Sequence, residues 1–186
     1  MSRGDVELQE HQDRAIQAMA QEVAARGYAQ TTVEDVLKRA GMSRRTFYRL
    51  FANREECFLA TYDTLKDDLF ARLQTASAKG GPHLEGVLGA LLDHVADHPE
   101  VAHVLLTEPA ATGASGLERH VEAMTALQMR LSAALALDTD NGGRVTGAAA
   151  IGAVAHVIQC HVWQGDAEHL RGLAPDLARL LHRLAE

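Results

Sequence analysis

Two signals for the start of a helix lie close together in this chain, with a glycine between them. Thr32-Val33-Glu34-Asp35 has the pattern of a capping box, in which a hydroxyl and a carboxylate satisfy each other's backbone N–H groups. Ser43 is a good N-cap for the next helix, and Gly41 suits the residue that ends the preceding one. Two short helices joined by so tight a turn form the helix-turn-helix pattern, whose second helix can enter the major groove of DNA.

The remaining pattern is also helical. Ile16, Met19 and Val23 mark one apolar stripe, and no segment shows the alternation of β-branched residues that is typical of a strand. Further helices are predicted at residues 11–26, 54–78, 83–97, 99–109, 115–136, 143–164 and 175–185. Gly80-Gly81-Pro82 is one of the breaks between them. We therefore predict an all-α chain of about nine helices, with a change of composition near residue 53.

The charge of the chain is unevenly distributed. The formal net charge is -7, yet residues 31–54 hold six basic and two acidic residues. Arginine donates two parallel hydrogen bonds to a guanine edge or a phosphate, so this basic segment suits a nucleic acid. On the helix after Ser43, Phe47, Leu50 and Phe51 fall on a plausible inner face. The outward face would then carry Arg44, Arg45, Tyr48 and Arg49; the alternative is a solvated arginine face on a small helical bundle.

The run RGYAQTTVEDVLKRAGMSRRTFYRLFANREECFLATYD, residues 26–63, resembles the DNA-binding region of the TetR family of bacterial transcriptional repressors. The shared features include Gly27-Tyr28, Ala40-Gly41-Met42-Ser43, Thr46-Phe47-Tyr48 and Asn53-Arg54-Glu55-Glu56. Two positions depart from the family pattern: Arg54 replaces the usual lysine, and Leu50 stands where tyrosine or histidine is common. The resemblance implies phosphate contacts from Thr32, Thr46, Tyr48 and Arg54, and base contacts from Arg44, Arg45 and Arg49.

The resemblance also implies two domains: a helix-turn-helix DNA-binding domain in residues 1–53, and a helical effector-binding and dimerisation domain in residues 54–186. Members of the family form homodimers through their last two helices, which would bind a palindromic operator in double-stranded DNA. The alternative is that these two helices simply close a monomeric core. The residues predicted for the dimer interface are Ala148, Ile151, Gly152, Ala155, Leu177, Leu180, Leu181 and Leu184.

A small-molecule effector is expected among the helices of the larger domain. Trp163, flanked by apolar and polar side chains at helical spacing, suggests part of an apolar pocket with a few polar groups. The residues predicted for this pocket are His94, Met124, Met129, His156, Gln159 and Trp163. The pairs His94/His98 and His156/Cys160 have a spacing that suits metal binding, but one pair supplies too few ligands, so neither a metal nor a cofactor is expected.

The favoured function is a homodimeric repressor whose operator binding is relieved by a small-molecule effector; a ligand-responsive activator is the alternative. A helical enzyme is less favoured because the chain contains no nucleophile elbow, HExxH motif, P-loop or GxGxxG motif. A protein-binding module that uses the basic segment is a third possibility. The polar N-terminus and the lack of a long apolar run predict no membrane association, with the protein in the bacterial cytoplasm at the nucleoid.

Overall fold

The structure is a computed structural model, and it describes residues 3–80 and 84–186. All of its regular elements in these ranges are helical, so the all-α prediction of about nine helices is confirmed. The predicted break at Gly81-Pro82 lies outside the described residues. In chain order the elements are α1 (Arg3–Arg26), η1 (Tyr28–Gln30), α2 (Val33–Ala40), α3 (Arg44–Leu50), α4 (Arg54–Gly80), α5 (Leu84–Asp97), α6 (Pro99–Ala102), η2 (His103–Thr107), η3 (Pro109–Thr112), α7 (Ala114–Ala134), α8 (Asn141–Trp163), η4 (Ala167–Leu170) and α9 (Ala174–Ala185).

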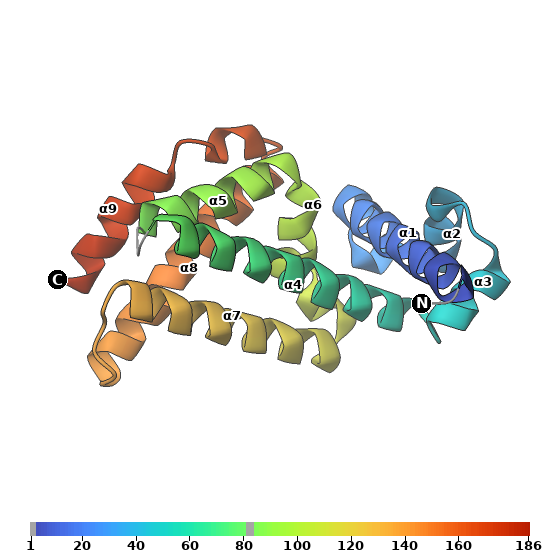
Figure 1. Cartoon of the computed structure of the whole chain (residues 1–186), viewed down its shortest axis with the longest axis horizontal. Coiled ribbons are helices and arrows are strands. Elements are labelled where there is room, and N and C mark those ends of the chain that lie inside the picture. The colour runs from blue at the N-terminus through green and yellow to red at the C-terminus, as the bar shows by residue number, and fades with distance from the viewer. Residues whose placement is uncertain (1–2, 81–83) are drawn as a thin grey trace.

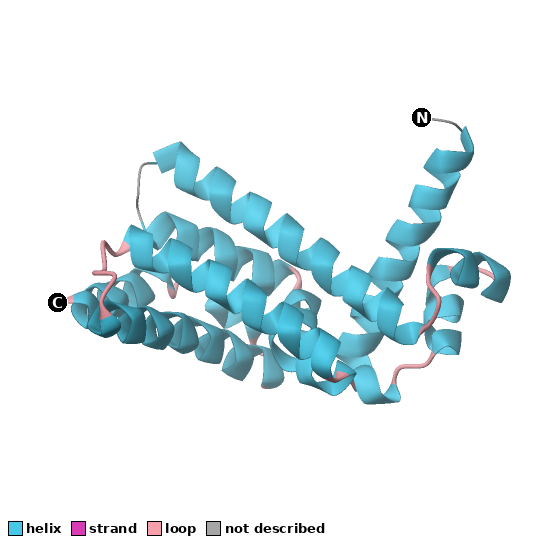
Figure 2. Cartoon of the chain, turned by 90° about the horizontal axis from the view of Figure 1, so that it is seen from below, coloured by secondary structure: helices cyan, strands magenta, loops and turns pink. Residues whose placement is uncertain are grey.

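The helices form two groups joined by α4. We call α1 to α3 with η1 the head, and α5 to α9 with η2, η3 and η4 the body. Figure 1 shows the head at one end of the molecule and α4 running from it along the whole body. In Figure 2 the N-terminal turns of α1 project away from the bundle, while the body helices lie roughly along α4.

The caps predicted for the head are present. The Thr32 hydroxyl accepts from the Asp35 N–H at 3.2 Å, and the Asp35 carboxylate accepts from the Thr32 N–H at 2.9 Å, which completes the capping box of α2. Gly41 ends α2 in the left-handed conformation with φ 62°. The Ser43 hydroxyl then accepts from the Thr46 N–H at 3.1 Å and starts α3. These local bonds orient α3 relative to α2.

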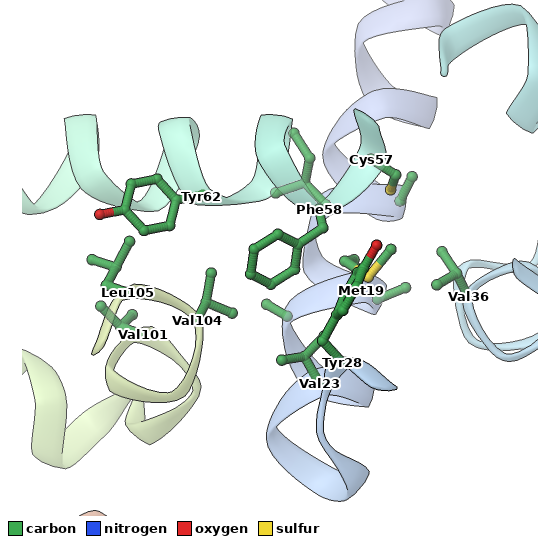
Figure 3. Close-up of a cluster of buried hydrophobic side chains, with 14 of the residues drawn as sticks. Met19, Val23, Tyr28, Val36, Cys57, Phe58, Tyr62, Val101, Val104 and Leu105 are labelled. Atoms are coloured by element: carbon green, nitrogen blue, oxygen red, sulfur yellow. The ribbon is translucent and has the colours of Figure 1, made fainter. Parts of the chain in front are cut away.

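The apolar core runs through the predicted domain boundary near residue 53. One cluster of buried side chains joins the head, through Met19 and Phe47, to Phe58 and Tyr62 of α4. Figure 3 shows that this cluster extends to Val104 and Leu105 of η2 in the body. A second cluster lies inside the body, where α5, α8 and α9 pack together. Head and body are therefore joined by a continuous buried core.

The helix predicted at 99–109 is interrupted. After α6 the chain widens into η2, a π-helical turn, and then tightens into η3. Pro109 explains the change: it has no N–H to donate to the Leu105 carbonyl four residues earlier, and its ring would clash with that carbonyl in a regular helix. The carbonyls of Leu105 and Leu106 are therefore released for other partners.

Candidate nucleic-acid interface and effector cavity

The two faces of α3 differ completely. The Phe47 side chain is fully buried, and it lies edge-to-face with Tyr48 and close to Phe51, with ring centroids 5.4 Å apart in both pairs. On the opposite face, the side chain of Tyr48 is half exposed and Arg44, Arg45 and Arg49 are exposed. The structure thus brings the predicted base-reading residues together on one outer surface, which we call the α3 face.

The charges of the α3 face are largely uncompensated. Arg44 forms an ion pair with Glu34 of α2, but both side chains are more than half exposed, so the pair stabilises the head little. Arg45 and Arg49 have no ion pair with any residue that the structure describes. A polyanion could therefore approach these two guanidinium groups without first breaking an internal pair.

The predicted phosphate-contacting threonines already serve as helix caps. The Thr32 hydroxyl donates to Asp35 Oδ2 at 2.7 Å, and the Thr46 hydroxyl lies 2.9 Å from that of Ser43. The hydrogen bonds that Thr32 donates from its hydroxyl and its backbone N–H hold the pKa of Asp35 below its ordinary value of 3.8. Phosphate contacts from Thr32 and Thr46 stay predictions, and both hydroxyls are at least partly accessible to solvent.

Arg54 has a structural role that the sequence pattern did not reveal. Its guanidinium carbon lies 4.2 Å from the centroid of the Tyr28 ring, and Nη1 donates to the carbonyls of Tyr28, at 3.2 Å, and of Thr31. The side chain therefore fixes η1, the turn between α1 and α2. A phosphate contact from Arg54 stays a prediction and would have to use its remaining donors.

A charge cluster binds α1 to α2. The carboxylate of Glu22 is buried, and its oxygens lie 2.6 Å from Arg39 Nε and 2.8 Å from Arg26 Nη2. Arg26 also reaches Asp35 at 3.2 Å. Because a buried carboxylate is costly without partners, these arginines stabilise the contact of α1 with α2.

A strongly apolar cavity lies between α4 and the body. Its interior offers about 50 Å³ to the centres of water-sized molecules, within a wider hollow of about 560 Å³ that includes open solvent. Of its lining side chains only Tyr62 and Lys66 carry polar groups, and Lys66 Nζ already lies 3.3 Å from Asp67 and 3.5 Å from Asp63. The other lining residues are Leu69, Phe70, Leu91, Val95, Val101, Ala102, Leu105, Leu106, Ala123, Met124, Leu127, Ile151, Val154, Ala155 and Ile158.

The predicted pocket residues are scattered rather than gathered at this cavity. Met124 lines it, but the side chains of Met129 and Trp163 are 69% and 61% exposed on the outside of α7 and α8. His156 is exposed, and His94 lies near the end of α5 with its ring centroid 5.1 Å from that of His98. Gln159 is half-buried and donates to the Leu106 carbonyl at 3.1 Å. Several side chains of α8 therefore point away from the cavity that its neighbours line.

The residues predicted for the dimer interface also divide into two sets. Leu177 and Leu181 are buried in the body's own core, and Ile151 and Ala155 line the cavity. The remaining four are exposed: Ala148, Gly152, Leu180 and Leu184. Dimerisation through these exposed residues stays a prediction.

The exposed surface of α8 is unusually apolar. By length and composition alone, α8 could span a membrane. Its most apolar stretch of 18 residues has a mean hydropathy of 1.4, and only 28% of that stretch is buried inside the protein. Val145, Ala149, Gly152, His156 and Trp163 recur at helical spacing along this exposed side, which we call the α8 face.

No group of three or more His, Cys, Asp or Glu side chains within the described ranges is arranged to hold a metal ion. His156 Nε2 lies 3.5 Å from Cys160 Sγ, which leaves that predicted pair with two ligands. Desolvation lowers the pKa of His94 below its ordinary 6.5, as the nearby Arg72 also does.

Comparison with known proteins agrees with this geometry. Residues 15–61, which span the end of α1 through the start of α4, match the family described as bacterial regulatory proteins, tetR family. The chain is 30% identical over 92 residues to the HTH-type transcriptional regulator TcmR of Streptomyces glaucescens. That match covers 48% of this chain and 41% of TcmR, so the chain aligns with less than half of this relative.

Solved structures share the fold over nearly the whole chain. The fatty acid degradation regulator FadR from Bacillus halodurans is 20% identical, with a TM-score of 0.79 over 92% of this chain and 94% of that one. FadR from Bacillus subtilis, solved in complex with stearoyl-CoA, is 17% identical, with a TM-score of 0.79 over 93% and 98%. A TetR-like transcriptional regulator from Rhodococcus sp. RHA1 is 21% identical, with a TM-score of 0.76 over 94% and 93%. The match to the tetR family of bacterial regulatory proteins thus covers residues 15–61, and over the rest of the chain the likeness to these solved structures is one of fold.

Proposed function

We propose that this protein is a sequence-specific DNA-binding regulator, a homodimeric repressor that acts in the bacterial cytoplasm. The observation that carries the proposal is the α3 face, where Arg45 and Arg49 are exposed opposite the buried Phe47. Such an arrangement lets a rigidly mounted helix present guanidinium groups to base edges in the major groove. The net charge of -7 disfavours nonspecific DNA contact elsewhere on the surface.

The second subunit would pack on the α8 face and the exposed leucines of α9, Leu180 and Leu184. An apolar face of this length is a poor surface to leave in water, and the small residues Ala149 and Gly152 permit close approach of another helix. A symmetric pair of heads would read two half-sites about 34–36 Å apart, one turn of DNA, which is why the operator is expected to be palindromic.

The effector would occupy the apolar cavity rather than the scattered residues predicted from the sequence. A molecule with a largely apolar body suits this lining, because Lys66 is already paired with two carboxylates and offers little to a strongly anionic group. FadR from Bacillus subtilis, which has the same fold, was solved with stearoyl-CoA. Effector binding would favour a conformation whose heads no longer match successive grooves; a ligand-promoted activator is the alternative.

The proposal is tested by selecting bound sites from random duplex DNA with the full-length protein. We expect an enriched palindrome whose binding weakens steeply with salt. A single unpaired half-site would contradict the dimer. Retention of a protein partner with no DNA binding at low salt would instead support the protein-binding module, and metal-dependent turnover would support an enzyme.

A further inference from the structure

The chain between the cavity and the head is a short irregular segment, η2 followed by Glu108. On one side Leu105 and Leu106 line the cavity. On the other side Val104 belongs to the core that also holds Tyr28 and Phe58. Figure 3 shows Phe58 between Val104 and Tyr28, and the ring centroids of Phe58 and Tyr28 lie 4.9 Å apart, while η2 also packs against α1 of the head. Whatever moves the cavity wall at η2 therefore moves a surface that touches the head.

Side chains from two body helices hold η2 by the carbonyls that Pro109 releases. His120 Nδ1 of α7 lies 2.9 Å from the Leu105 carbonyl, and Gln159 Nε2 of α8 donates to the Leu106 carbonyl at 3.1 Å. Both α7 and α8 also line the cavity. Two helices of the cavity wall, α7 and α8, thus hold η2 in position.

On the head side, Glu108 contacts the backbone directly. Its Oε2 accepts from the Tyr28 N–H at 3.0 Å, across 80 residues of sequence. Gly27 lies directly beside this carboxylate: its φ is 78°, a conformation that favours glycine, and a Cβ placed there would be in ordinary contact with Glu108 Oε1 at 3.4 Å. The carboxylate therefore lies over the Gly27–Tyr28 peptide.

The same short stretch of backbone is held from the opposite direction by Arg54. Arg54 binds the carbonyls of Tyr28 and Thr31, while Glu108 binds the N–H of Tyr28. Thr32, the N-cap of α2, follows immediately in the chain. Glu108 and Arg54 together thus fix the turn from which the helix-turn-helix begins.

We propose that Glu108 is a positioning residue that links occupation of the cavity to the orientation of the head. This inference rests on the proposed function and adds its regulatory contact. A ligand that displaces Leu105 or Leu106 shifts η2, and Glu108 shifts with η2. The N–H of Tyr28 then either loses the Glu108 carboxylate as its acceptor or moves together with that carboxylate. The two conformations of η2 then differ in affinity for both ligand and DNA, which is the requirement for coupling between the two sites.

The contact itself is tested by amide hydrogen exchange in the full-length protein, followed by NMR at Tyr28. We expect Glu108→Ala to speed exchange of this amide by about tenfold, and Glu108→Gln, which keeps an acceptor oxygen, to have a smaller effect. Glu118→Ala removes an exposed carboxylate from α7 and serves as the matched control with no change. An unchanged rate in Glu108→Ala would overturn the proposal.

The link from η2 to the head is tested from the body side with Gln159→Ala. This substitution removes the hydrogen bond to the Leu106 carbonyl of η2 and leaves the residues of the head unchanged. We expect exchange at Tyr28 to rise about threefold or more, while the amide of Ile158 keeps its rate. If Gln159→Ala leaves the exchange rate of the Tyr28 amide unchanged, then η2 does not link the cavity to the head. The proposal is then wrong, whatever ligand or DNA the protein binds.

Coupling is measured with N-phenyl-1-naphthylamine, a neutral apolar dye, and the selected DNA site. In the wild type we expect the dye to weaken DNA binding by about fivefold or more. In Glu108→Ala the dye should weaken DNA binding by less than about twofold. The affinity of the DNA-free variant for the dye should equal that of the wild type. An undiminished effect of the dye on DNA binding overturns the proposal. Absence of any DNA binding would instead refute the proposed function, and the exchange experiments would still decide on Glu108.

Discussion

Helices α3 and α8 each bury one face and expose another, but their exposed faces have opposite chemistry. The seven-residue α3 exposes three arginines and a half-exposed tyrosine. The α8 face of the 23-residue α8 consists of valine, alanine, glycine and tryptophan with one histidine, and Val145 and Trp163 are 69% and 61% accessible. A cationic face is well solvated in water and attracts anionic partners, whereas an exposed apolar face gains stability when another surface covers it. The comparison supports the two proposals that α3 binds DNA and that a second subunit covers the α8 face.

The comparison depends first on α3 being a fixed support. Phe47→Ala removes a fully buried ring and should lower the free energy of unfolding by about 3–5 kcal/mol. Tyr48→Ala, the neighbouring exposed aromatic, should change it by less than about 1 kcal/mol. Urea denaturation of both variants measures the difference. Equal losses would show that α3 is not mounted through Phe47.

The role of the α8 face is tested with two glycines that have open space around them in the single chain, Gly152 on α8 and Gly86 on α5. Gly152→Glu would place a carboxylate in an apolar subunit interface and should weaken dimerisation about a hundredfold. Gly86→Glu should leave it unchanged. Sedimentation over a range of protein concentrations gives both constants. Equal behaviour of the two variants would exclude α8 as the contact.

The role of each arginine on the α3 face can be tested one residue at a time. Arg45→Ala should lower affinity for the selected site by about 10- to 100-fold and relax base preference where Arg45 reads. Arg72→Ala, which removes an exposed arginine from the part of α4 far from the head, is the control and should have little effect. Fluorescence anisotropy with specific and random duplexes measures both. Equal weakening by Arg45→Ala on the two duplexes would reassign it from base reading to phosphate contact.

The smallest expected effect concerns pH and involves histidines of the body rather than α3. Desolvation lowers the pKa of both His94 and His103 below 6.5. The unfolded chain therefore binds more protons than the folded one near and below that pH, so acidification should reduce the free energy of unfolding. Urea denaturation at pH 7.5 and 5.5 should show a smaller decrease in the His94→Asn/His103→Asn variant. An identical decrease in the free energy of unfolding of the variant and the wild type would show that these histidines do not cause the pH dependence.

The head was largely predictable because its signals are local. Thr32, Gly41 and Ser43 fix the ends of α2 and α3 through bonds within a few residues, and the family resemblance covers the same segment. For the body the sequence predicted the helices, but of the residues it named for an effector pocket only Met124 lines the cavity. Because α8 is apolar around most of its circumference, its sequence does not tell which side meets the cavity, and Trp163 was placed there when it is exposed. The Glu108 contact with Tyr28 spans 80 residues and leaves no local pattern.

The ion pair between Arg44 and Glu34 has a further consequence if α3 reads DNA. Arg44 must then give up Glu34 before it binds a phosphate or a base, so its contact with DNA gains less free energy than that of an unpaired arginine. Arg45 and Arg49 have no such pair with a described residue and bind DNA without this cost. Glu34 is thus an internal competitor of the operator. It can tune how tightly the protein holds DNA without changing which bases it prefers.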